Sequence, residues 1–303
     1  MSIWDNFFYT MLSTSTPIIL AALGGIMTRQ VGMFNLGLEG MMTVAAFVSV
    51  YLTSITGNLA AGLFGGIAAT VLLGLFMAFI SIRLKADIFV VGIAANALGT
   101  GLTTFLGLLL TGMQGTMVFK KTPVLPAVVI PYLKSIPVLG PFLSGHTVID
   151  YLSIILPVVL SFVIFRTAFG YHARAAGLNA RVAENCGISV VRHQYIAYVW
   201  CGIFCGLAGA SMSMPIAMYA GGLIGMTNGR GWTAMAVVIL SAGNPVVALL
   251  ASWVLGAISA LGNVLQTNGV FSSRLVMAFP FLAALIGTAV YSCLQKRKGS
   301  LNI

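Results

Sequence analysis

Glu39 is the residue whose chemistry most depends on its surroundings. It lies in the polar, glycine-punctuated step 34–40 of an otherwise apolar region, and it is one of five acids in 303 residues. A carboxylate at bilayer depth costs roughly 2.5 to 3.5 kcal/mol, so it needs a partner, a water-filled cavity or a place near the interface. Glu39 and Asn35 are therefore predicted to shape a solute pathway. The alternative is a helix cap at headgroup level, since an acid favours a helix start.

Catalytic motifs are missing from the chain. There is no Gly-Lys dipeptide, hence no loop of the type that cradles ATP phosphates, and there is no HExxH or CxxC element. His146, His172 and His193 fall in connections between apolar stretches. The sequence thus predicts a chain with no catalytic residue, no metal site and no bound cofactor of its own.

The other acids flank spans or lie in loops, so a proton relay at depth is disfavoured. A carrier that couples to sodium through backbone carbonyls at broken helices stays open as an alternative. Asn96 and Thr100 share an apolar stretch and either line a polar path or serve as interhelical hydrogen-bond glue, typically about 0.6 kcal/mol per bond. A second glycine-rich step, 221–231, adds three more pathway candidates: Asn228, Arg230 and, just beyond it, Trp232.

Composition defines the elements that position these residues. The chain is 59% hydrophobic and 7% charged, which excludes an ordinary soluble domain. Each crossing of the hydrocarbon needs about 20 apolar residues. We therefore predict one all-α polytopic membrane domain over 1–303 with about nine transmembrane helices. The expected spans are 7–27, 35–55, 59–82, 88–111, 148–165, 195–216, 221–242, 246–265 and 275–294.

The basic residues set the orientation. With the amino terminus outside and the carboxyl terminus cytoplasmic, ten of the fifteen Lys and Arg residues lie inside, as the positive-inside rule requires. This distribution explains the net charge of +10 without nucleic acid. The start of the chain lacks the basic region and cleavage site of a removable signal peptide. The four cysteines lack paired loop spacing, so no disulfide framework is indicated.

Two connections are long. The outer one, 112–147, contains half of the prolines and is predicted to be a rigid external cap, with a docking surface and a merely structural lid as the alternatives. The inner one, 166–193, is predicted to begin with a short exposed helix ended by Gly187.

The two glycine-rich steps are five predicted spans apart. Because five is odd, the segments 7–111 and 195–294 would have opposite orientation and form an inverted repeat. Interrupted segments at matching positions of two halves indicate broken helices near a central pathway. Coincidence in a glycine-rich membrane protein is the alternative.

Five groups of residues form a recognisable set of motifs: Arg29, Gly32 and the step 35–40; Ala86, Asp87 and 92–96; Phe169, Gly170 and 176–188; 206–210; and 229–239. In this order they resemble the inner-membrane permeases of bacterial ABC importers, in the superfamily of ribose, nucleoside and branched-chain amino acid systems. The Asn-Leu-Gly-Leu-Glu-Gly and Gly-Arg-Gly-Trp elements are most similar to the nucleoside and simple-sugar branch.

The resemblance implies a mechanism and partners. It assigns ATPase coupling to Ala176, Gly177, Asn179, Arg181, Glu184, Gly187 and Ile188. It implies a homologous second permease in a heterodimer, a cytoplasmic ABC ATPase that binds ATP with magnesium, and an extracytoplasmic solute-binding protein or lipoprotein. We therefore expect a bacterial inner-membrane permease that moves a nucleoside or simple sugar by alternating access. A sodium-coupled secondary carrier and a permease for branched-chain amino acids are the alternatives.

Overall fold

Seven helices of the computed structural model are long and apolar enough to cross a membrane. The structure describes residues 3–113, 115–119, 122–128, 144–222 and 225–267, with residues 282, 285, 287 and 289. The seven helices are α1 (Ile3–Gln30), α2 (Leu38–Thr56), α3 (Leu59–Arg83), α4 (Ile88–Thr111), α6 (Val148–Arg166), α9 (Val190–Ser213) and α11 (Pro245–Thr267). A helical, multi-pass membrane protein is confirmed.

The segment 221–242 does not form the full crossing that we expected. Its helix, α10 (Arg230–Leu240), has only 11 residues. The chain before it is strand β4 (Met218–Ala220) followed by turns, because Asn228 and Gly229 adopt left-handed φ values of 43° and 75° that end a regular helix. The ninth expected span, 275–294, lies almost wholly outside the described residues. The described part therefore does not confirm nine helices, and the inverted repeat remains a prediction.

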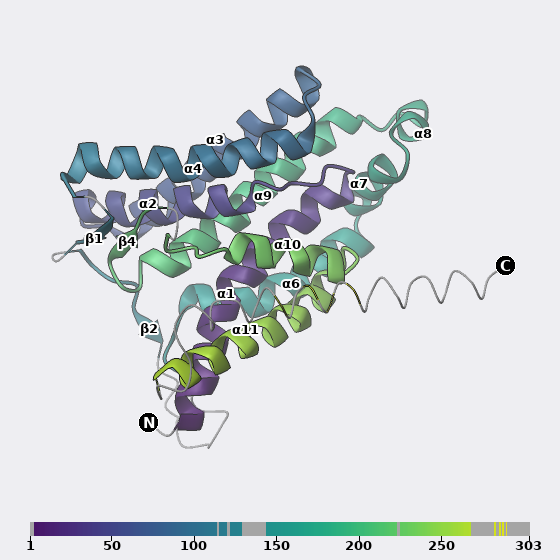
Figure 1. The fold of residues 1–303 in the computed structure, drawn as a ribbon. Coiled ribbons are helices and arrows are strands. Elements are labelled where there is room, and N and C mark those ends of the chain that lie inside the picture. The colour runs from purple at the N-terminus through teal and green to yellow at the C-terminus, as the bar shows by residue number, and fades with distance from the viewer. Residues whose placement is uncertain are drawn as a thin grey trace.

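The long helices cross at inclined angles, and α10 lies in the middle of the view, in contact with α1, α2 and α11 (Figure 1). Helix α1 runs the length of the molecule, from the labelled amino terminus to the neighbourhood of α7, and α11 packs beside it. Helix α9 contacts α1, α2 and α3. Its backbone approaches theirs closely because it carries small residues: a Cβ on Gly206 would meet the Ile67 Cα at 2.7 Å.

Short strands lie at the end of the molecule opposite α7 and α8 (Figure 1). Strand β1 (Thr116–Val118) pairs antiparallel with β4, so the start of the expected outer cap binds the segment before α10. Strand β2 (Ala127–Val128) pairs antiparallel with β3 (His146–Thr147), which leads directly into α6. These two pairings fix both ends of the 112–147 connection, as far as the structure describes it.

Candidate functional site

Asn35 shapes the start of α2. Its Oδ1 accepts a hydrogen bond from the Gly37 N–H at 2.8 Å, which turns the chain into the helix. Its Nδ2 lies 3.5 Å from the Met41 Sδ and 3.4 Å from the Cys201 Sγ. The side chain is 3% exposed. In this conformation Asn35 shapes the backbone beside the predicted pathway and faces sulfur atoms of α2 and α9.

Asn96 fixes α4 to the same part of α2. Its Oδ1 accepts from the Gly40 N–H at 2.7 Å, and its Nδ2 donates to the Leu36 carbonyl at 2.9 Å. Both ends of the amide thus satisfy backbone groups where α2 begins. The two helices touch here because Gly40 and Gly99 lie back to back, with the Gly40 Cα 2.8 Å from the position of a Cβ on Gly99.

Glu39 joins α2 to α10. Its Oε1 accepts from the Gly229 N–H at 2.9 Å, and its Oε2 accepts from the Gly231 N–H at 2.6 Å. These donors belong to the N-terminal end of α10, where backbone N–H groups lack intrahelical partners and the helix dipole is positive. The carboxylate therefore has the partner that its burial requires, and the partner is another helix end.

The turn before α10 is attached to α2 a second time. The Thr43 Oγ1 lies 3.2 Å from the Thr227 Oγ1. Thr43 also donates to the Glu39 carbonyl at 2.8 Å. Thr227 is 3% exposed. The side chains of Glu39 and Thr43, one turn apart on α2, thus hold the Asn228–Gly229 turn and α10 in one position.

The opposite end of α10 is held by the last residues of α1. The Arg29 Nη1 donates to the Val238 carbonyl. The Gln30 Nε2 donates to the Gly243 carbonyl at 2.8 Å. A cation at a helix C-terminus complements the negative end of the dipole. Helix α10 therefore has Glu39 at its positive end and Arg29 at its negative end.

Helix α10 is too short to cross the hydrocarbon. With 11 residues it is about 16 Å long, roughly half of a 30 Å core. Its last turn lies beside the end of α1. With the end of α1 at the cytoplasmic surface, as the basic residues predict, the start of α10 with Glu39 and Arg230 would lie near the middle of the layer. Broken helices of membrane carriers present their termini at that depth.

Arg230 lines a cavity of about 350 Å³ on the β3 side of this break. Its Nη1 donates to the Met226 carbonyl at 3.2 Å, and no carboxylate of the described residues lies within 4.0 Å. Hydroxyl groups face the same cavity, which is lined by Tyr9, Ser13, Thr14, Pro17, Thr147, Asp150, Ser211, Met212, Pro215, Ile216, Met226 and Arg230. We call it the outer vestibule, after the orientation predicted from the basic residues. Its polar lining and its cation suit a small solute rich in oxygen atoms.

The remaining pathway candidates are less closely grouped. Trp232 is 43% exposed, and Asn228 is exposed on the turn. Thr100 is half-buried on α4, one turn after Asn96. None of these three lines the outer vestibule. The structure thus brings Glu39 and Arg230 together at the start of α10, and it places Asn35 and Asn96 at the start of α2.

The inner connection, 166–193, forms two short helices where we expected one; we call it the coupling segment after the role that the resemblance implies for it. They are α7 (Ala168–Leu178) and α8 (Ala180–Asn185), separated by Asn179, whose Oδ1 accepts from the Val182 N–H at 3.2 Å. Gly187, with φ at 81°, follows the second helix. Ala176 packs with Ala183, Val190 and Ile188, whereas Arg181 and Glu184 are exposed.

Gly177 brings this segment against the end of α1. A Cβ at Gly177 would collide with the Gln30 carbonyl and would lie 2.9 Å from the Gly32 nitrogen. The coupling segment is therefore in backbone contact with the residues that hold the end of α10.

Among the described residues, no three His, Cys, Asp or Glu side chains are grouped so as to hold a metal ion.

Residues 7–285 match the family model described as the permease component of the branched-chain amino acid transport system. The chain belongs to this family. The permease is 32% identical to the putative glucose ABC transporter permease TsgC13 of Haloferax volcanii, over 86% of this chain and 78% of the relative. It is 32% identical to the guanosine ABC transporter permease NupQ of Bacillus subtilis, over 90% of this chain and 87% of the relative.

Further comparisons agree with this assignment. The nucleoside ABC transporter permease NupC of Lactococcus lactis is 29% identical over 93% of this permease and 90% of the relative. PsaBC from Streptococcus pneumoniae, solved in complex with a Fab, shares the fold at a TM-score of 0.51 and 15% identity, covering 97% of this chain and 96% of that chain. The family resemblance read from the sequence is therefore confirmed.

The sequence did not reveal how the permease fixes α10. Arg29 was noted as a basic residue and as part of a motif, Thr227 only as a member of the step 221–231, and Gln30 and Thr43 were not noted. Each of them interacts with a residue at least 184 positions away. The available signal was a basic residue at the end of α1, which a helix C-terminus nearby would attract.

Proposed function

We propose that this permease is one of two membrane subunits of an ATP-driven importer that takes up a nucleoside or a simple sugar. The observation that carries the proposal is its similarity, over most of its length, to permeases named for guanosine, nucleosides and glucose. Bacillus subtilis has two such guanosine permeases, NupQ and NupP, both similar to this chain. That pair supports a heterodimer with a homologous second permease.

The solute would meet this chain at the outer vestibule and the break before α10. A nucleoside or sugar offers hydroxyl and carbonyl oxygens, which the Arg230 guanidinium binds as a donor. Glu39, with Asn35 and Asn96, acts by fixing the two helix starts beside that route. We place Asn228, Thr100 and Trp232 along its continuation toward the second permease. In this role no residue of the chain performs covalent chemistry.

Energy would enter through α7 and α8. In the proposed complex a cytoplasmic ABC ATPase binds ATP with magnesium, grips residues 176–188 and moves them as a rigid body. Leu178 and Val182, which are 88% and 55% exposed, suit such a contact. Because Gly177 rests on the end of α1, and α1 holds α10, the movement reaches the break at mid-layer. An extracytoplasmic binding protein would deliver the solute on the β1 side, with the amino terminus outside and the bacterial inner membrane as the location.

Reconstitution tests the proposal. The permease, its candidate partner permease, the ATPase and the binding protein are placed in liposomes, and uptake of labelled guanosine, glucose and leucine is measured. We expect uptake of the nucleoside or the sugar that needs ATP and all four proteins. Uptake by this chain alone with a sodium gradient would support the secondary carrier instead, and uptake of leucine alone would support the amino acid branch.

Substitution of the coupling segment gives a second test. Glu184→Arg on exposed α8 should reduce ATPase association and uptake together, while solute binding by the binding protein stays unchanged. Arg83→Gln, at the exposed end of α3, is the matched control on the same side and should behave as the wild type. Unchanged ATPase association in Glu184→Arg would remove α8 from the coupling role.

A further inference from the structure

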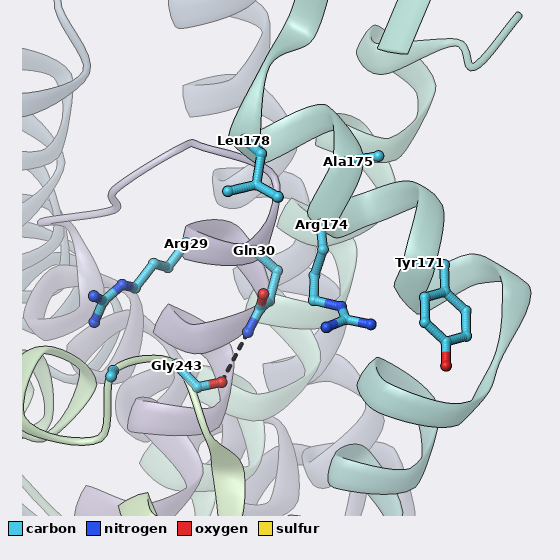
Figure 2. Close-up of a pocket in the computed structure, with 9 residues that line it drawn as sticks. Arg29, Gln30, Tyr171, Arg174, Ala175, Leu178 and Gly243 are labelled. Carbon is cyan, nitrogen blue, oxygen red and sulfur yellow. Dashed lines mark hydrogen bonds between the residues drawn. The ribbon is translucent and has the colours of Figure 1, made fainter. Parts of the chain in front are cut away.

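A second cavity, of about 480 Å³, lies where the coupling segment meets the end of α1. It is lined by Arg29, Gln30, Tyr171, Arg174, Ala175, Gly177, Leu178, Ala242 and Gly243. The lining contains two arginines and no acid. Figure 2 shows Arg174 between Gln30 and Tyr171, whereas the Arg29 guanidinium lies on the other side of Gln30 and points away from Arg174.

Arg174 is the cation without a counter-charge in this cavity. Its guanidinium lies over two aromatic rings, 5.1 Å from the Phe165 centroid and 4.9 Å from the Tyr171 centroid. Its buried Nε has no hydrogen-bond partner among the described residues. The rings hold the guanidinium in place by contact with its face, and they accept no hydrogen bonds from the N–H groups in the guanidinium plane. Such a group is prepared to bind a phosphate or a carboxylate.

Exposed apolar side chains form a stripe along α6 that ends beside Arg174. Ile155, Val158, Val159 and Phe162 recur at helical spacing and are 50% to 63% exposed. Phe165, under Arg174, continues the stripe at the end of the helix. From Ile155 to Phe165 the helix rises about 15 Å, which matches one leaflet of a 30 Å hydrocarbon core. We call these residues the α6 stripe.

We propose that an anionic phospholipid binds here, with its acyl chains along the α6 stripe and its headgroup phosphate on Arg174. The combination of an apolar track one leaflet long with an unpaired arginine at its end fits a lipid better than a soluble anion, which would use only the arginine. Basic pockets between membrane helices on the cytoplasmic side bind such headgroups. Tyr171, which also lines the cavity, is half-exposed, and tyrosine is a residue type enriched at the level of the headgroups.

The position gives the lipid a role in coupling. The cavity includes Gly177 and Gly243, which belong to the contact between the coupling segment, the end of α1 and the turn after α10. A phosphate bound to Arg174 would hold α7 against the end of α1. The inference rests on the chain spanning a membrane and does not depend on which solute is transported.

Native mass spectrometry of the purified permease tests the site. The protein is titrated with phosphatidylglycerol and, separately, with phosphatidylcholine of the same acyl chains. We expect retention of phosphatidylglycerol over phosphatidylcholine. Arg174→Gln should weaken that retention about fivefold, whereas Arg83→Gln should leave it unchanged. Phe162→Gln, on the α6 stripe, should weaken retention of the same lipid without changing the charge of the cavity.

Four other outcomes of these experiments would overturn the proposal. Equal retention of the two lipids excludes a headgroup site, and this comparison uses only wild-type protein, so it holds even if Arg174→Gln does not fold. Displacement of phosphatidylglycerol by inorganic phosphate at equal concentration assigns the cavity to a soluble anion. Loss of the lipid on adding the ATPase assigns Arg174 to that protein contact. Wild-type retention by Arg174→Gln removes the residue from the site.

Discussion

Removing the Glu39 carboxylate should separate α10 from α2. Two hydrogen bonds, from the Gly229 and Gly231 N–H groups, would be lost together. Bonds between membrane helices average about 0.6 and reach about 1.7 kcal/mol, and an acid at a helix N-terminus adds about 0.3 to 1 kcal/mol. A charged acceptor belongs at the upper end of the range. We therefore expect Glu39→Ala to lower the free energy of unfolding by about 2 to 4 kcal/mol.

Glu39→Gln distinguishes a helix clamp from a solute ligand. A glutamine has one acceptor oxygen, so it restores at most one bond and turns its amide donors toward the other N–H. It should therefore recover less than half of the stability lost in Glu39→Ala. The assay is thermal unfolding of the purified permease in detergent, without solute, with uptake measured in parallel. Thr43→Val removes the hydroxyl contact to Thr227 and the bond to the Glu39 backbone carbonyl within α2, but it leaves the Glu39 carboxylate in place. It should cost about 0.6 kcal/mol.

The reasoning fails if Glu39→Ala and Glu39→Gln unfold at the wild-type temperature. If they do so and uptake is still lost, the carboxylate acts on the solute and not on α10. If uptake is also normal, Glu39 has neither role. Loss of stability and of uptake in parallel, with the Thr43→Val variant close to wild type, is the result that the geometry requires.

Four further changes follow from the same contacts. Gly40→Ala should place a methyl group against the Ala95 carbonyl and cost about 1 to 3 kcal/mol; a full yield of monodisperse protein in size-exclusion chromatography would contradict this. Asn96→Leu should leave the Gly40 N–H and the Leu36 carbonyl, at and just before the start of α2, unpaired and lower the thermal midpoint by an amount equivalent to about 1 to 2 kcal/mol, and an unchanged midpoint would be inconsistent with it. Arg29→Gln should weaken α10 by about 0.3 to 1 kcal/mol with Arg29→Lys as the charge-retaining control; equal unfolding of the two variants would show that the charge is irrelevant. Leu178→Asp should reduce ATPase binding in a pull-down at unchanged thermal stability, and normal binding would remove Leu178 from the docking surface.

The sequence predicted the features that depend on residues close together in the chain, and it missed those that depend on distant contacts. Glu39 was recognised because a carboxylate at depth requires a partner, but its partner lies 190 residues away and no periodicity points to it. The segment 221–242 was predicted to cross because its composition is apolar. The Asn228–Gly229 turn and the pairing of β4 with β1 prevent this. In this region the turn-forming residues, and not the hydropathy of the segment, decide where the helix begins.

The polar residues illustrate the same limit. Asn96 was open to two interpretations, pathway lining or interhelical bonding, and the structure uses both ends of its amide for bonding. Spacing alone does not separate these roles, because both require a polar group on the face toward another helix. Arg230 was grouped with Asn228 and Trp232 by sequence proximity, yet only Arg230 lines the outer vestibule. Successive side chains of a helix point in different directions, so residues that are neighbours in the sequence need not line the same cavity.

The contacts of α10 explain why a half-length helix suits a transport subunit. One face of α10 packs in the core, and polar contacts fix both of its ends: Glu39 of α2 at its start, and Arg29 with Gln30 of α1 at its end. The α1 end is in turn in backbone contact with Gly177 of the coupling segment. In the proposed mechanism a displacement of α7 would therefore shift one end of α10 while the other end stays fixed at Glu39. The helix would tilt about its clamped start, beside Arg230 and the outer vestibule, and a small movement at the ATPase side would change the width of the route at mid-layer.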